Sequence, residues 1–394
     1  MILTLSTPHP QPRSGLVRWF TAACLAGLAT LASVSAHAET GIPWIDSRTN
    51  LTIYGDLRVR YEYDWDSQND AGVDRNDRNR GRIRARLGAG YQFDDQWSIG
   101  ARVRTGDTAS QQSPHLTFAT DDGQPDDLEF VADRYFVQFK HRSGYIWGGR
   151  NNLPFWYQNE LFWDEDVTPT GLGGAYDWKI SDGKLTAAAG AFYLPDGGYS
   201  LNGQMAGAQA KWTGPIKVGQ LTAAAGLNYI FGDEDALYLR QRNGERDYMI
   251  GVGSVQWVYS PGKLPLTFGA DVFYNFLNYD AGDVAPFPAK SEDEVLGYVF
   301  SVQLGQLKKR NDWLVGYYYS HIERFAVNAS YAQDDWIRFG NGAQTDASDF
   351  EGHEFRAAYA LSAKINVVAR LYLVEAITTV QDGNRFRLDL NWRF

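Results

Sequence analysis

The sequence predicts an all-β fold, a transmembrane antiparallel β-barrel of about 16 strands, with about 18 as the alternative count. Three observations support this fold class. The last predicted strand, residues 383–394, alternates charged and apolar side chains and ends on Phe394. The front of the chain has the features of an export signal. The connections between the predicted strands are short and long in turn, as in outer-membrane barrels.

Residues 1–38 have the features of a cleaved secretory signal peptide. Arg13 and Arg18 give a positively charged start, the following stretch is apolar, and residues 36–38 fit the small-x-small cleavage rule. A transmembrane anchor is the alternative, but the apolar run is short and is interrupted by threonine and serine. The expected domains are a signal peptide at 1–38, a short periplasmic N-terminal segment at 39–50 and the barrel at 51–394.

Composition excludes several classes of protein. The only cysteine, Cys24, lies inside the predicted signal, so the mature chain would have no disulfide, no catalytic thiol and no thiolate metal site. The formal net charge is −10 and becomes about −12 without the signal, which argues against nucleic acid as a partner. No later segment has the roughly 18 continuous apolar residues of a membrane helix.

Two-residue alternation of apolar and polar side chains recurs after residue 50, whereas helical periodicity is hard to find. The strands predicted in one direction lie near 51–64, 97–105, 143–149, 184–193, 217–230, 263–277, 311–322 and 364–375. Their antiparallel partners lie near 80–93, 128–140, 172–180, 203–213, 246–259, 293–305, 349–362 and 383–394. Aromatic residues gather at strand ends, as Trp97, Trp257 and Trp392 do, which is typical of the interface girdles of a membrane barrel.

The connections alternate in length along the chain. Short turns such as 94–96, 142–144 and 181–183 separate long loops such as 106–127 and 150–171. Outer-membrane barrels carry short turns on the periplasmic side and long loops outside, so both termini are expected to be periplasmic. No stretch rich in proline, serine or charge divides the mature chain, and we predict a single barrel domain.

Arginines occupy alternate positions of the first predicted strands and of the last ones. The candidate pore-lining arginines are Arg58, Arg60, Arg82, Arg84, Arg86, Arg102, Arg104, Arg134, Arg356, Arg370 and Arg387. A closed barrel pairs its last strand with its first, so these side chains would form one continuous basic wall. Because an arginine facing lipid costs about 2–4 kcal/mol at the bilayer midplane, we expect them to point into the lumen.

The third long loop, near 150–171, combines apolar and acidic residues. Its aromatic candidates are Phe155, Trp156, Tyr157 and Trp163, and its acidic candidates are Glu160, Asp164, Glu165 and Asp166. An apolar loop of this length is expected to fold onto another surface. If it folds into the barrel, as the third loop of general porins does, its carboxylates would face the arginines across a constriction, and the field between them would select polar solutes by charge.

A filled lumen is the alternative to an open constriction. The arginines and acids could simply neutralise each other and leave no aqueous path. A barrel of about sixteen strands usually leaves an aqueous channel, whereas about eight strands are filled by their own side chains. The strand count therefore favours an open channel.

Several short segments resemble a known family. Residues 55–62, 80–88 and 104–107 look like the opening strands of the proteobacterial putative porin family. Residues 149–155 and 162–166 resemble the third-loop region of that family. The opening strands are also similar, more weakly, to those of alginate-export barrels. The resemblance implies a passive channel in the outer membrane of Gram-negative bacteria and names no solute.

The sequence thus predicts a porin that lets small hydrophilic solutes and ions diffuse passively, with no cofactor. A mild anion preference is expected because arginines outnumber acids on the early strands. One alternative is a channel specific for an oligosaccharide or an organic acid, in export or uptake, with the loop aromatics as a sliding surface. A barrel-embedded hydrolase is less favoured, since its nearest candidate pair, Ser320 and His321, is adjacent in a strand and points to opposite faces.

A metal site is not predicted. Acidic clusters at 121–127, 233–235 and 292–294 could bind hard cations through carboxylate oxygens. Their spacing matches no calcium loop, however, and solvated loops explain them more simply. The histidines that follow the signal are scattered, without ligand-like spacing.

The expected partners follow from this location. They are outer-membrane lipid and lipopolysaccharide, the barrel-assembly machinery, and small polar solutes. The assembly machinery would recognise the terminal strand through Trp392 and Phe394. A homotrimer is a possible assembly.

Overall fold

The computed structural model describes residues 50–69, 71–108, 110–196, 200–232, 246–280, 282–284, 289–338 and 347–394. The predicted signal peptide and all but the last residue of the predicted periplasmic segment lie outside the described residues, as does the acidic cluster at 233–235. In the part of the chain that is described, no helix is long and apolar enough to cross a membrane.

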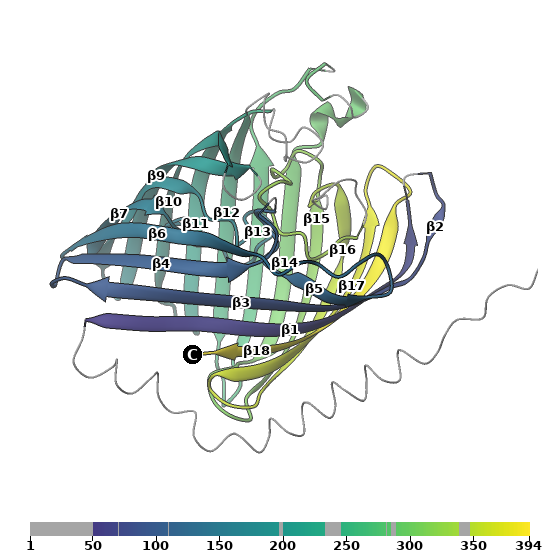
Figure 1. The fold of residues 1–394 in the computed structure, drawn as a ribbon. Coiled ribbons are helices and arrows are strands. Elements are labelled where there is room, and N and C mark those ends of the chain that lie inside the picture. The colour runs from purple at the N-terminus through teal and green to yellow at the C-terminus, as the bar shows by residue number, and fades with distance from the viewer. Residues whose placement is uncertain are drawn as a thin grey trace, which may run out of the picture. The chain divides into compact units, whose positions relative to one another are not determined.

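Sixteen long antiparallel strands, all within the described residues, close into a barrel (Figure 1). They are β1 (Leu51–Gln68), β3 (Arg78–Gln92), β4 (Trp97–Thr105), β6 (Phe130–His141), β7 (Gly144–Arg150), β8 (Thr170–Ile180), β9 (Gly183–Asp196), β10 (Ser200–Pro215), β11 (Gln220–Phe231), β12 (Tyr248–Tyr259), β13 (Leu266–Asn275), β14 (Leu296–Gly305), β15 (Trp313–Ile322), β16 (Phe350–Ala360), β17 (Ile365–Ala376) and β18 (Asp382–Arg393). The barrel closes because β1 pairs with β3 on one side and with β18 on the other. The predicted fold class is confirmed.

The strands follow the alternation in the sequence, and their observed ends differ from the predicted ones by only a few residues. Three short elements inside the long loops were not predicted: β2 (Asp74–Arg75), β5 (Leu116–Thr120) and the 3-10 helix η2 (Ala289–Asp293). β5 continues the pairing with β3 beyond the end of β4, with Arg82 opposite Thr117. Such short runs carry too little alternation to be recognised as strands.

Successive side chains of each strand face opposite sides of the barrel wall. In β3, Arg84 is 3% exposed, whereas Leu87 is 52% exposed on the outer face. Across the closing seam, Arg60 lies opposite Asp389 and Val59 opposite Leu390, so the two faces stay in register. An apolar outer face and a charged inner face are what a wall between lipid and a polar lumen requires.

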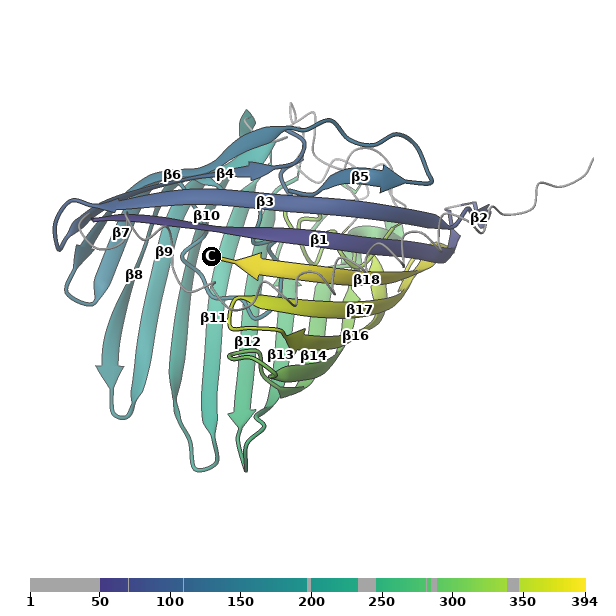
Figure 2. The same ribbon diagram turned by 60° about the horizontal axis from the view of Figure 1, so that its bottom comes forward.

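The connections alternate between short and long, as predicted. Short hairpins such as those at 142–143 and 181–182 lie at one end of the strands, visible for β8–β12 in Figure 2. The connections at the opposite strand ends include two long ones. We call 151–169 the third loop, and the described residues of the other connection, 323–338 and 347–349, the seventh loop.

The third and seventh loops fold into the barrel. Phe162 of the third loop packs on Phe273 of β13, with ring centroids 5.8 Å apart. Trp163 stacks on Tyr331 of the seventh loop at 5.4 Å. These rings belong to one buried cluster that includes inward-facing side chains from β9 to β17. Apolar packing therefore holds both loops against that part of the inner wall.

Candidate functional site

The inner faces of β1, β3, β17 and β18 carry a set of charged side chains that we call the ionic wall. Its members are Asp56, Arg58, Arg60, Glu62, Asp64, Arg82, Arg84, Arg86, Arg370, Arg385, Arg387 and Asp389. Across the closing seam, Arg60 contacts Asp389 at 2.6 Å and Arg387 contacts Glu62 at 2.7 Å. Buried charges are tolerated when they are paired in this way.

Sequence reasoning missed the acids of this wall. Asp56, Glu62 and Asp64 occupy the same alternate positions of β1 as the arginines, and Asp389 does so on β18. That shared spacing was visible in the sequence and could have identified them. In the structure, the expected basic wall is a network in which arginines pair with acids across neighbouring strands.

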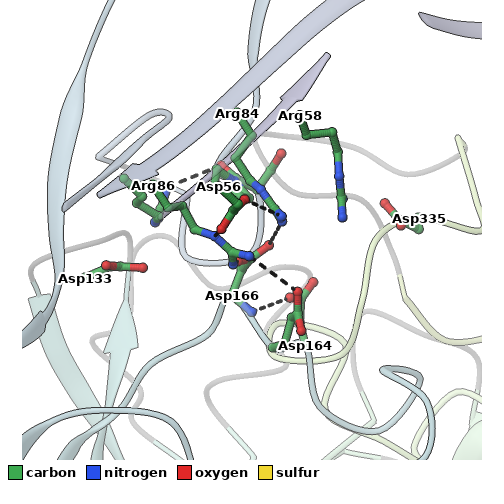
Figure 3. Close-up of polar contacts among 12 residues, drawn as sticks. Asp56, Arg58, Arg84, Arg86, Asp133, Asp164, Asp166 and Asp335 are labelled. Carbon is green, nitrogen blue, oxygen red and sulfur yellow. Dashed lines mark hydrogen bonds and ion pairs between the residues drawn. The ribbon is translucent and has the colours of Figure 1, made fainter. Parts of the chain in front are cut away.

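One acid of the third loop joins the ionic wall directly. Asp166 contacts Arg86 at 2.6 Å and Arg84 at 3.3 Å, and Asp56 contacts the same two guanidinium groups (Figure 3). Burial raises the pKa of Asp166, but the positive charges of Arg84, Arg86 and Arg104 outweigh it and bring the pKa to about 2. Asp166 is therefore ionised at any physiological pH.

The other buried acids of the third loop lie in a different electrostatic setting. Burial, followed by the negative charges of Glu165, Asp335 and Asp166, raises the pKa of Glu160 to about 8. Burial and the nearby Glu160 and Asp166 also raise the pKa of Asp164 well above its usual range. Glu160 is therefore protonated at neutral pH and can donate a hydrogen bond.

Backbone hydrogen bonds tie the third loop to the seventh. The Asp164 N–H donates to the Tyr331 carbonyl at 2.8 Å, and the Gln333 N–H donates to the Glu160 carbonyl at 3.0 Å. The acids of the third loop are therefore positioned by a partner segment far away in the sequence.

Residues 106–108 and 110–115, between β4 and β5, also pack inside the barrel. Gln112 donates through Nε2 to the Ala329 carbonyl of the seventh loop at 3.0 Å. Arg104 donates to the Ser110 carbonyl at 2.8 Å and so holds this segment in place. Gly106 turns the chain inward with a φ of +113°, and a Cβ there would meet Pro114 Cα at 2.7 Å.

A cavity of about 410 Å³ lies between the ionic wall and the packed loops. The predicted residues that line it are Arg58, Arg84, Arg356, Arg370, Phe155, Tyr157, Glu160, Trp163, Asp164, Glu165 and Asp166. Glu165 is the most open of the acids, and its carboxylate lies 3.9 Å from Arg86. The structure thus brings the third-loop acids and four of the predicted arginines to one cavity.

Other predicted arginines lie outside the cavity lining. Arg60 and Arg387 sit behind it and reach Asp335 of the seventh loop, and Arg82 donates to the Ser113 hydroxyl. Arg102 pairs with Asp133. The remaining members of this group are Arg86, Arg104 and Arg134.

Several lining residues were not predicted. Asp334 and Asp335 come from the seventh loop, and Glu354 comes from β16. Glu354 contacts Arg356 at 2.6 Å and Arg370 at 3.5 Å. The seventh loop carries acids next to Trp336, as the third loop carries acids next to Trp163, and that likeness could have identified it.

Three predicted aromatic residues are not part of the cavity lining: Trp156 of the third loop, and Trp392 and Phe394 of the predicted assembly signal. Trp156 is held by two 2.8 Å hydrogen bonds between its backbone and Gln209, and the Lys211 ammonium lies 5.7 Å from its ring. Trp392 and Phe394 are exposed near the end of β18. Their proposed recognition by the assembly machinery remains a prediction.

Residues 71–225 match the model of a family described as putative porin. The predicted resemblance to that family is confirmed. The matched segment begins after β1 and includes the whole of β3, the third loop and the strands from β4 to β10. No curated protein sequence matches the chain.

Solved structures share the barrel fold. OprB of Pseudomonas putida is 12% identical, with 88% of this chain and 94% of that chain covered and a TM-score of 0.53. OmpF of Salmonella typhi is 13% identical, with 88% and 98% covered and a TM-score of 0.52. At this identity the likeness concerns the fold alone. Together, the family match and the fold indicate an outer-membrane channel.

Proposed function

We propose that this barrel is a porin through which small hydrophilic solutes and ions diffuse down their gradients. The observation that carries the proposal is the charged cavity between the ionic wall and the third loop, in a chain that matches the putative porin family. Solutes would be selected by size at the packed loops and by charge at the cavity. No cofactor or energy source takes part.

The third and seventh loops together would form the constriction. Their apolar sides are buried against β9–β17, which leaves their acidic groups facing the ionic wall. Fixed charges of opposite sign on two sides of a narrow path give a strong transverse field. Such a field favours polar solutes over apolar ones of the same size.

A mild anion preference is proposed for acidic to neutral pH. Arg58 lines the cavity and its side-chain hydrogen bond is to a neutral asparagine, whereas Glu160, with a pKa of about 8, is protonated over this range. The carboxylates of Glu165 and Asp334 act in the opposite direction and keep the preference small.

Liposome swelling tests this function. Vesicles containing the folded protein are placed in isotonic solutions of sugars of increasing size. We expect swelling with monosaccharides that falls as the sugars become larger. No swelling with any sugar or with small salts would favour the filled-lumen alternative.

A solute-specific channel is the second candidate, favoured by the rings of Phe155 and Tyr157 at the cavity. Block of the current that saturates with one solute class would distinguish it from a general porin. A hydrolase is disfavoured because Ser320 is fully buried while His321 binds Glu351 at 2.9 Å on the other face of the strand. Contacts with lipopolysaccharide and assembly as a homotrimer remain proposals.

A further inference from the structure

We propose that the cavity contains a binding site for a hydroxylated monocarboxylate, with Arg58 as the carboxylate-binding group. This inference rests on the proposed channel function and adds the class of solute that the channel prefers. It is carried by the partners of Arg58 and by the groups that face it.

Arg58 is held with one edge of its guanidinium free of carboxylates. Its Nε donates to Asn391 Oδ1 at 2.7 Å, and Asn391 Nδ2 donates to Asn366 Oδ1 at 3.0 Å. This chain of neutral amides fixes the side chain and leaves Nη1 and Nη2 available. Figure 3 shows the guanidinium of Arg58 beside the Arg84 cluster with no contact drawn to a carboxylate.

The other arginines of the cavity lining have acidic partners. Arg84 contacts Asp56 and Asp166, and Arg356 and Arg370 both contact Glu354. Among the described residues, Arg58 alone of these four has no carboxylate within ion-pair distance. An arginine edge of this kind matches the planar, bidentate geometry of a carboxylate.

Arg58 lacks a carboxylate partner because of a single residue of β18. In the closing seam, Arg58 faces Asn391, whereas Arg60, two residues further along β1, faces Asp389. An aspartate at 391 would continue the ion pairing of the wall. The asparagine leaves Arg58 without a contacting carboxylate at the place where the cavity meets the wall.

The groups on the other side of the cavity define the rest of the solute. Protonated Glu160 can donate a hydrogen bond to a hydroxyl group, since its pKa is about 8 because of burial and its acidic neighbours. The carboxylates of Glu165 and Asp334, which also line the cavity, would repel a second carboxylate of the solute. A monocarboxylate with hydroxyl groups fits both requirements, whereas a dicarboxylate does not.

The cavity volume suits a solute of this kind. At about 410 Å³, it lies within the range of small-molecule sites, about 300–1,000 Å³. Aromatic surface from Phe155 and Tyr157 is available for the carbon skeleton.

Equilibrium binding to the folded barrel in detergent tests the site. The probes are gluconate, glucose and glucarate, which share a six-carbon hydroxylated skeleton and carry one, no and two carboxylates. Titration calorimetry at pH 7 should show gluconate binding roughly tenfold more tightly than glucose, as a charge-assisted arginine contact implies. Glucarate should bind more weakly than gluconate. Equal binding of gluconate and glucose, or tighter binding of glucarate, would overturn the proposal.

Two variants locate the site. Arg58→Gln removes the cation, and Asn391→Asp supplies the missing carboxylate while keeping the arginine. Both should abolish the advantage of gluconate over glucose. Lys364→Gln, at an exposed short turn, removes the same charge outside the cavity and should keep that advantage. If both cavity variants still bound gluconate like the unchanged protein, Arg58 would not be the site.

Current measurements separate this inference from the proposed function. If the barrel conducts but gluconate neither binds nor blocks, the channel function stands and the solute class is wrong. If gluconate binds but no current passes, the site stands and the channel function fails. Folded protein that shows neither binding nor current contradicts both.

Discussion

Carboxyl groups close together in the sequence have different pKa values because their neighbours differ. Asp166 touches two arginines of the ionic wall and stays ionised. Glu160 and Asp164 lie in the same loop, but burial and neighbouring acids dominate their surroundings. One loop therefore presents both a fixed negative charge and two groups that can change charge.

The raised pKa of Glu160 predicts a pH-dependent ion preference. As the pH rises through about 8, Glu160 loses its proton and the cavity gains negative charge, so the anion preference should fall between pH 6 and pH 9. The reversal potential under a salt gradient measures this shift. Glu160→Gln should show a smaller shift, and an undiminished shift in that variant would contradict the assignment.

The same titration should weaken docking of the third loop. Because the folded pKa of Glu160 lies above its usual value of 4.5, its contribution to docking is present at low pH and is lost as the pH rises through about 8. Limited proteolysis of the loop should therefore be faster at pH 9 than at pH 6. Glu160→Gln should reduce the difference, whereas equal rates at both pH values in the unchanged protein would argue against it.

Replacing Asp166 tests the contact between the third loop and the wall. Asp166→Asn leaves Arg84 with Asp56, and Arg86 with Asp56 and the more distant Glu165, so the cavity becomes more positive and the anion preference should increase. The reversal potential again gives the result. Asp95→Asn, in an exposed short turn, is the matched control and should change nothing. A preference that moved toward cations in D166N would be incompatible with this geometry.

At the scale of elements, the position of the third loop depends on the seventh. Trp163 is 5% exposed and stacks on Tyr331. Trp163→Ala should cost the loop about 3–5 kcal/mol of docking free energy, because a large buried ring leaves a cavity. We expect a larger single-channel conductance when the loop leaves the lumen. Trp178→Ala, on the outer face, is the control, and an unchanged conductance in W163A would rule out this anchor.

The strands could be predicted from the sequence because alternation of side chains is a local signal. β4 has the bounds that the alternation predicts, Trp97–Thr105. The seventh loop could not be placed in this way, since its position depends on contacts such as Asp335 with Arg60 between distant segments. Of the candidate site, the arginines and third-loop acids were identified by type and spacing. Their pairing depends on strand register, which a sequence pattern does not specify.

At the scale of the whole barrel, the closing seam between β1 and β18 depends on buried ion pairs. Asp389 contacts both Arg60 and Arg370, and it is fully buried. Asp389→Asn should destabilise the barrel by about 3–5 kcal/mol, because it removes the acid closest to the guanidinium groups of Arg60 and Arg370. The measurement is heat-modifiable mobility on gels. The temperature at which the band of the folded barrel disappears should be lower in the variant. Asp95→Asn should leave it unchanged, and an equal melting temperature in D389N would show that the seam does not depend on this pair.

The central claim is that a barrel with two loops packed inside it still conducts, through the charged cavity. Single-channel current across a planar bilayer under a salt gradient tests this most directly. We predict stable current steps with a reversal potential that indicates a mild anion preference at pH 6. The folded state of the protein can be checked by its heat-modifiable mobility on gels. If folded protein gave no current steps, the claim would be contradicted, and the lumen would be filled by its own loops and ion pairs.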